Sequence, residues 1–182
     1  MSQGLRDRVW LTAHIRMKTE RRLRSTSRTL NYITVWYSTI LTCLSVYQLV
    51  AEKQVFRDVA SAVLAIAVLA LSIFVPSLNL DQQADRFREC YLKLQRLLDT
   101  IADDDMLTTA YHDVLEAYPN HPPRDYTDFV LASHLANQSL TSAGKLILPT
   151  IPMHIGYWFR QVRGVAVAGG GYLAPGLLYF IL

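Results

Sequence analysis

Charged residues are missing from two long stretches of this 182-residue chain. No Asp, Glu, Lys or Arg occurs over residues 30–50 or 59–80, which gives uncharged runs of 21 and 22 residues. A helix needs roughly 20 apolar residues to cross a hydrocarbon core about 30 Å thick. We do not expect a cleaved signal peptide, because such a peptide is a shorter apolar run near the first residues, whereas the first run here starts at Leu30 and a second run follows it. We therefore predict two retained membrane spans, at about 30–50 and 59–79.

Cysteine is scarce, and recognisable catalytic motifs are absent. The two cysteines, Cys43 and Cys90, have no CxxC or alternating Cys/His spacing around them, which argues against a disulfide framework and a structural metal. The sequence has no P-loop, no GxSxG and no HExxH, and its five histidines are scattered. We therefore expect a protein that is not an enzyme and binds no metal or cofactor.

Positive charge is concentrated at the N-terminus. Residues 1–29 hold eight Lys or Arg against Asp7 and Glu20, a net charge of +6. Because basic residues beside a span tend to stay in the cytoplasm, we expect a cytoplasmic N-terminus, a tight external turn over 51–58 and a return to the cytoplasm after Leu80. The basic segment either only sets this topology or also faces anionic lipid headgroups. Its candidate lipid-facing residues are Arg16, Lys18, Arg21, Arg22, Arg24 and Arg28.

Apolar residues recur every three or four positions after the second span, which predicts a long helix running straight out of the membrane. This seam either packs on the basic N-terminal helix of the same chain or forms an oligomeric coiled coil. The triplet Asp103–Asp105 can cap a next helix over about 106–118, and prolines over 119–123 separate it from a third helix over about 125–144. The seam residues are Leu80, Ala84, Phe87, Tyr91, Leu94, Leu98 and Ile101.

A last apolar region occupies residues 146–182, and its final 19 residues, 164–182, carry no charge. We favour a third span or a re-entrant segment there over a buried soluble helix. The expected fold is thus an all-α integral membrane protein. Its parts are a basic cytosolic helix (1–29), a transmembrane hairpin (30–80), a cytosolic helical region (81–145) and the C-terminal hydrophobic segment (146–182).

The first span carries a stripe of polar residues on one helix face. These side chains either pack and hydrogen-bond against neighbouring helices or line a pore formed by several copies, and both can hold in one oligomer. In the second span, Pro76 predicts a kink, which is either static or a hinge. The polar face consists of Asn31, Thr34, Ser38, Thr42 and Ser45.

The layout and one sequence block resemble a known family. A basic helix containing the segment 10–17 leads into two close spans and a long helix, followed by a Tyr-Pro-Asn-His block and an Asp-Tyr pair. This resembles the SLATT family of bacterial two-transmembrane conflict-system effectors, in the branch with an additional C-terminal hydrophobic segment. From the residues alone, the block is either a structural turn that caps helix ends or a contact for a sensor or partner. Its residues are Tyr118, Asn120, His121, Asp125, Tyr126 and Phe129.

The resemblance implies an effector of anti-phage, abortive-infection systems in the bacterial inner membrane. Such proteins are thought to oligomerise and to form a pore or disrupt the membrane when a partner enzyme signals infection. That partner would be a genomically linked nucleotidyltransferase or reverse transcriptase, and the signal a nucleotide. The main alternative is a non-conducting anchor that recruits a cytosolic enzyme. A transporter subunit or lipid enzyme is less favoured, because neither of the first two spans holds a charged residue.

Overall fold

The computed structural model describes residues 2–50, 55–142 and 145–181. The chain divides into two compact units. The bundle unit comprises Met1–Arg24 and Asp81–Gln161, and the apolar unit comprises Ser25–Leu80 and Val162–Leu182. Each unit is considered by itself below.

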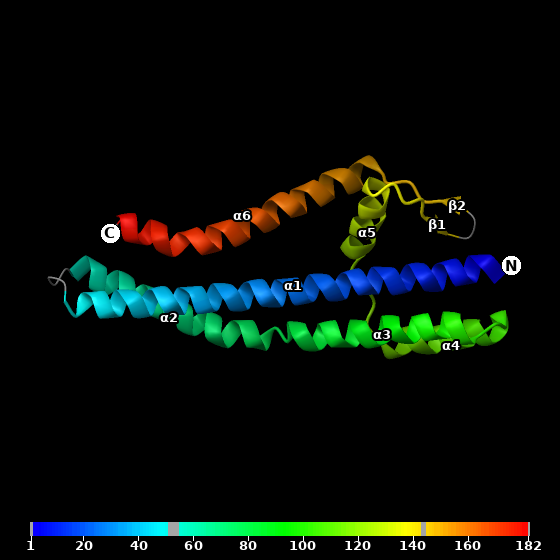
Figure 1. Cartoon of the computed structure of the whole chain (residues 1–182), viewed down its shortest axis with the longest axis horizontal. Helices are drawn as coiled ribbons and strands as arrows, with labels where there is room; N and C mark the ends of the chain where they lie inside the picture. Colours follow the sequence, from blue (N-terminus) through cyan, green and yellow to red (C-terminus); the bar gives the residue numbers. More distant parts are fainter. Residues whose placement is uncertain (1, 51–54, 143–144, 182) are drawn as a thin grey trace. The chain divides into compact units, whose positions relative to one another are not determined.

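The described chain is helical apart from one minimal hairpin, which agrees with the all-α expectation. Strands β1 (Thr141–Ser142) and β2 (Lys145–Leu146) pair antiparallel, with Thr141 opposite Leu146. Figure 1 traces the order of the elements along the sequence. The helices are α1 (Ser2–Gln48), α2 (Val55–Ser77), α3 (Leu80–Thr100), α4 (Asp104–Ala117), α5 (Pro123–Leu135) and α6 (Ile151–Ile181).

Helix α1 is continuous through both the basic segment and the expected first span. The boundary expected at residues 29 and 30 therefore lies inside a helix. The sequence explains this continuity, because no Gly or Pro occurs between Leu5 and Gln48 to interrupt the backbone hydrogen bonds. The change from charged to apolar side chains near residue 30 alters the polarity of the helix surface but leaves the helical backbone unbroken.

The core of the bundle unit lies between α1 and α3. Val9 and Ala13 of α1 form a buried cluster with Cys90 and Leu94 of α3. The apolar seam of α3 thus packs on the basic helix of the same chain, which is the first of the two alternatives. Its residues Ala84, Phe87 and Leu94 are buried, and Tyr91, Leu98 and Ile101 are half-buried.

Polar side chains cap the end of α3 and the start of α4. The guanidinium of Arg6 donates to the carbonyl oxygens of Leu98 at 3.2 Å and Ile101 at 2.6 Å, which satisfies acceptors that a helix end leaves free. The carboxylate of Asp103 accepts from the backbone N–H of Asp105 at 3.2 Å. The predicted capping of α4 by the acidic triplet is therefore confirmed.

Helix α5 is shorter than the helix expected over 125–144. It starts at Pro123 and ends at Leu135. Asn137 adopts a left-handed conformation (φ 56°), and the N–H of Gln138 returns to the carbonyl of Ser133 at 2.9 Å. This turn satisfies the last carbonyls of α5 and stops the helix before the hairpin. Residues 143–144 lie outside the described part of the chain.

In the apolar unit, α2 exposes most of its apolar side chains. The stretch Val55–Thr100 is the one in the described residues that is long and apolar enough to cross a membrane, and 11% of its most apolar window is buried. The core helix of a soluble protein would be mostly covered, so α2 is suited to contact lipid. The described parts of α1 and α6 do not meet the same criterion, so the first and third spans stay predictions. Exposed side chains of α2 include Val59, Val63, Ile66, Leu69, Ile73 and Phe74.

The helix expected to run straight from the second span is interrupted. Helix α2 ends at Ser77, α3 begins at Leu80, and Asn79 between them is left-handed with φ 48°. Pro76 lies in the last turn of α2, where its missing N–H weakens the helix, and asparagine tolerates the left-handed region better than most residues. The break thus has a local cause in two neighbouring residues.

Side-chain contacts hold the helices of the apolar unit together. The Gln48 amide donates to the Ser61 hydroxyl at 3.0 Å, joining α1 to α2. The Trp36 indole of α1 donates to the Tyr172 carbonyl of α6 at 3.1 Å. A side chain at Gly171 would meet Ile33 at 3.1 Å, so glycine allows α6 to approach α1 closely. The expected external turn includes residues 51–54, which lie outside the described residues.

Candidate functional site

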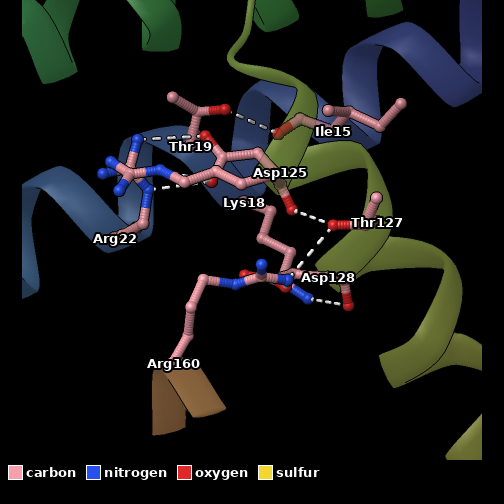
Figure 2. Close-up of polar contacts among 9 residues, drawn as sticks. Ile15, Lys18, Thr19, Arg22, Asp125, Thr127, Asp128 and Arg160 are labelled. Atoms are coloured by element: carbon pink, nitrogen blue, oxygen red, sulfur yellow. Dashed lines mark hydrogen bonds and ion pairs between the residues drawn. The ribbon is translucent and has the colours of Figure 1, made fainter. Parts of the chain in front are cut away.

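The basic face of α1 meets α5 in a buried ion pair of the bundle unit. Arg22 donates through Nε and Nη2 to the two carboxylate oxygens of Asp125, at 2.8 and 3.0 Å (Figure 2). The Asp125 side chain is 1% exposed and that of Arg22 is 27% exposed. Two parallel N–H···O bonds between charged groups are among the strongest polar contacts in proteins. This pair therefore fixes the start of α5 on α1.

A second group of contacts surrounds Asp128, one turn further along α5. Lys18 of α1 donates to the Asp128 backbone carbonyl, and Arg160 of α6 pairs with the Asp128 carboxylate (Figure 2). Arg160 also donates to the Thr127 hydroxyl at 3.2 Å. Burial lowers the pKa of Lys18, against the opposing effect of the Asp128 and Asp125 charges. The cluster thus ties the first part of α6 to α5 and α1.

Arg16 lies on the same helix but is enclosed completely, at 0% exposure. Its Nη1 donates to the Cys90 thiol of α3. Its Nε and Nη2 are buried and have no hydrogen-bond partner in the described structure. Nδ1 of His121, in the turn before α5, is likewise buried without a partner. Burial and the Arg16 charge lower the pKa of His121, whereas burial raises that of Cys90.

Two other residues of the family-like block, Phe129 and Tyr118, pack on α1 and α3. Phe129 contacts Trp10 edge-on, with ring centroids 6.4 Å apart. Tyr118 lies under the Lys93 ammonium, 5.0 Å from ring centroid to nitrogen, and its hydroxyl donates to Glu89 at 3.4 Å. Tyr126 is half-buried and Asn120 is exposed. The block serves as packing surface for the bundle, and its exposed end is at Asn120.

The six basic residues expected to face lipid do not all lie on the surface. Arg16 is buried, and Arg22 and Lys18 are engaged with α5. Arg24 pairs with Glu20 and with Asp85 at 2.7 Å. Arg21 and Arg28 are exposed. Part of the positive charge therefore holds the bundle together, because carboxylates and carbonyls of α3 and α5 come within reach of α1.

A signal for this arrangement was present in the sequence. The buried positions of α1 repeat at intervals of four and three residues, and the basic Arg16 occupies one of them. Reading the basic segment only as a run of charge misses this face. The pairing with Asp125, Asp128 and Cys90 had no sequence signal, because those residues are 74 or more positions away. The buried positions with this spacing are Val9, Ala13, Arg16, Glu20, Leu23 and Ser27, and Ile15 and Thr19 beside them are buried as well.

The polar face of the first span satisfies its hydroxyl donors within α1. Each hydroxyl donates to the carbonyl four residues earlier, as Thr34 does to Leu30 at 3.0 Å and Ser38 does to Thr34 at 2.9 Å. Thr42 and Ser45 do the same, and Asn31 is exposed. The four hydroxyls can therefore rest against lipid with their donors paired, while their oxygen lone pairs remain available. Pro76 is exposed near the end of α2.

The comparisons with known proteins identify the family. The family model described as SMODS and SLOG-associating 2TM effector domain family 5 matches residues 2–166. The chain therefore belongs to this SLATT family of two-transmembrane effector domains. Neither the comparison with curated proteins nor that with solved structures gave a match.

Proposed function

We propose that this SLATT protein is a non-catalytic effector of bacterial anti-phage defence that oligomerises in the inner membrane and permeabilises it. The observation that carries the membrane role is α2, whose apolar side chains are largely uncovered within the chain. Family membership supports the effector role. In this proposal the N-terminus and the bundle unit lie in the cytoplasm, where a linked partner enzyme supplies the signal.

The polar face of α1 is the proposed wall of the conduit. Its hydroxyl hydrogens are engaged by the backbone, so the oxygen lone pairs are what the face presents to its surroundings. Such a wall suits water and cations better than anions. In a single copy the four hydroxyls donate within α1, so assembly of several copies would create the conduit without leaving those hydroxyl donors unpaired in the closed form.

Expression in bacteria, with a dye that reports membrane potential, tests the proposal. The triple substitution T34L/S38L/T42L replaces the polar face, and we expect it to abolish depolarisation in the presence of the genomic partner. Thr39→Leu is the matched control, because Thr39 makes the same bond to Val35, at 2.9 Å, from a neighbouring helix face. Immunoblots of membranes establish equal amounts of each variant.

Two results would contradict the pore. Absence of depolarisation by the wild-type protein with its partner would favour the non-conducting anchor, especially if the partner copurifies. Equal depolarisation by the triple variant and by Thr39→Leu would show that this face does not line the conduit.

A further inference from the structure

One side of the buried Arg16 guanidinium has no hydrogen-bond partner among the described residues. A guanidinium presents Nε–H and one Nη as a pair of parallel donors. In Arg16 this pair, Nε and Nη2, is enclosed by protein and bonded to nothing in the described chain. A buried charge is strongly unfavourable unless it is paired and hydrogen-bonded. Because no described residue pairs with it, this edge is suited to bind a ligand.

Arg22, on the same helix, shows what such an edge accepts. Its Nε and Nη2 hold the two oxygens of Asp125 side by side. The matching atoms of Arg16 are suited to the same kind of ligand, a planar or tetrahedral oxyanion that accepts two parallel bonds. A water molecule can accept from these donors, but it does not neutralise the charge.

The surrounding charges leave Arg16 without a counter-ion. The carboxylate oxygens of Asp125 are bound by Arg22, and Asp128 is paired with Arg160. Cys90 is a neutral thiol at physiological pH, since burial raises its pKa. Among the described residues, the carboxylates of Asp125 and Asp128 are engaged by Arg22, Arg124 and Arg160. Glu20, one turn along α1 from Arg16, is paired with Arg24.

His121 supplies a second polar group at the same place. Its Nδ1 is buried without a partner, and the ring is near enough to Arg16 and Asp125 to feel both charges. The residue is half-buried rather than enclosed, and its neighbour Asn120 is exposed. His121 therefore combines a buried, unpaired ring nitrogen with a part that reaches the surface of the bundle unit. Protonated on Nδ1, the imidazole would donate a further bond to an anion.

We propose that Arg16 and His121 form a binding site for a phosphoryl group, either of a soluble phosphate compound or of a lipid headgroup. A phosphate monoester carries nearly two negative charges at pH 7 and presents three acceptor oxygens, whereas a carboxylate carries one charge and presents two oxygens. Arg16 holds two phosphoryl oxygens through Nε and Nη2, and His121 donates to a third. If the proposed function holds, this is where a phosphate-bearing signal would reach the bundle unit.

Ligand-dependent thermal stability of the full chain in detergent tests the site. The soluble probes are inorganic phosphate and AMP, with adenosine as the phosphate-free control at constant ionic strength. At a concentration about 100 times Kd, a ligand shifts the folding equilibrium about a hundredfold towards the folded state. We expect this rise in Tm for phosphate and AMP but not for adenosine. Mixed micelles of the detergent with phosphatidylcholine, with and without phosphatidic acid, form the lipid arm, which is read by the same change in Tm.

Arg16→Met separates ligand binding from a purely structural role. It keeps the length of the side chain and removes the buried charge, so without phosphate we expect a Tm at least equal to that of the wild type and no response to phosphate. Arg21→Met is the matched control, because Arg21 is an exposed arginine on the same helix. If Arg16→Met does not fold, Arg16→Lys retains the charge without the paired donors, and we expect a weaker response.

The three outcomes distinguish a soluble ligand, a lipid headgroup and the absence of a site. A response to AMP and phosphate that depends on Arg16 supports a soluble ligand, and a response confined to phosphatidic acid supports a lipid headgroup. No response in any arm, or an equal response in Arg16→Met, would overturn the site. Because binding is measured without conduction, a failure here leaves the depolarisation test of the proposed function untouched.

Discussion

Replacing Asp125 by asparagine should strongly destabilise the bundle unit. The substitution keeps the size of the side chain but removes the charge that two nitrogens of Arg22 share, at 2.8 and 3.0 Å. It also replaces one carboxylate oxygen by an NH2 group, which then faces one of the Arg22 N–H donors. Arg22 is then left partly buried without its counter-ion, which is the costly result of breaking a buried pair.

The magnitude follows from the burial of the two partners. Removing one member of a fully buried pair costs about 3–5 kcal/mol. Asp125 is 1% exposed, but the Arg22 side chain retains 27% exposure, so water can solvate the orphaned cation in part. We expect Asp125→Asn to cost about 2–4 kcal/mol, somewhat below the fully buried case. For a chain of this size, that corresponds to a fall in Tm of about 5–15 °C.

Thermal unfolding of the purified chain, followed by tryptophan fluorescence, measures this loss. Arg124→Met is the control, because its guanidinium lies 4.0 Å from Asp125 and its side chain is 46% exposed, so we expect a change within about 0.5 kcal/mol. A double-mutant cycle with Arg22→Met should give a coupling of about 1–3 kcal/mol. A loss below about 1 kcal/mol, or strictly additive single and double losses, would refute the assigned role of the pair.

Two further predictions concern the same unit. Leu94→Ala should cost about 2–5 kcal/mol, because Leu94 is 0% exposed in the core between α1 and α3, whereas Leu92→Ala, at a position 42% exposed, should change stability by less than about 0.5 kcal/mol in the same melts. Burial and the Arg16 charge lower the pKa of His121 below its ordinary 6.5. The unfolded chain therefore binds the proton more readily, so the His121 contribution to stability should be lost as pH falls below about 6.5. His121→Gln should flatten this dependence in melts across pH 5–8, and an unchanged slope would contradict the assignment.

The apolar elements of the fold were largely predictable, because their residues repeat at helical spacing. The seam of α3 followed from intervals of three and four, and its burial is observed at Ala84, Phe87 and Leu94. The cap at Asp103 followed from the affinity of carboxylates for free helix N–H groups. The break at Asn79 was missed, since a single left-handed residue leaves no periodic signal in the sequence.

The charged site was much less predictable. The net charge of the N-terminal segment indicated topology and lipid contact, but a charge count does not show which side of a helix is covered. The enclosure of Arg16 depends on α3 and the turn before α5, which meet α1 only after folding. Likewise, the need of the α1 hydroxyls for outside partners was overestimated, because each can donate to its own helix.

The sequence by itself determined which segments are helical, which helix is apolar enough for a membrane and to which family the chain belongs. Helices follow from the spacing of apolar residues, and the candidate membrane helix follows from a long run of uncharged residues. Family membership follows from residues that match the family along the chain. Tertiary structure alone decided that the basic helix is a core element, with Asp125 bound by Arg22 and with two nitrogens of the buried Arg16 unpaired among the described residues. Pairing and desolvation are properties of neighbours in space, and these neighbours lie far apart in the sequence.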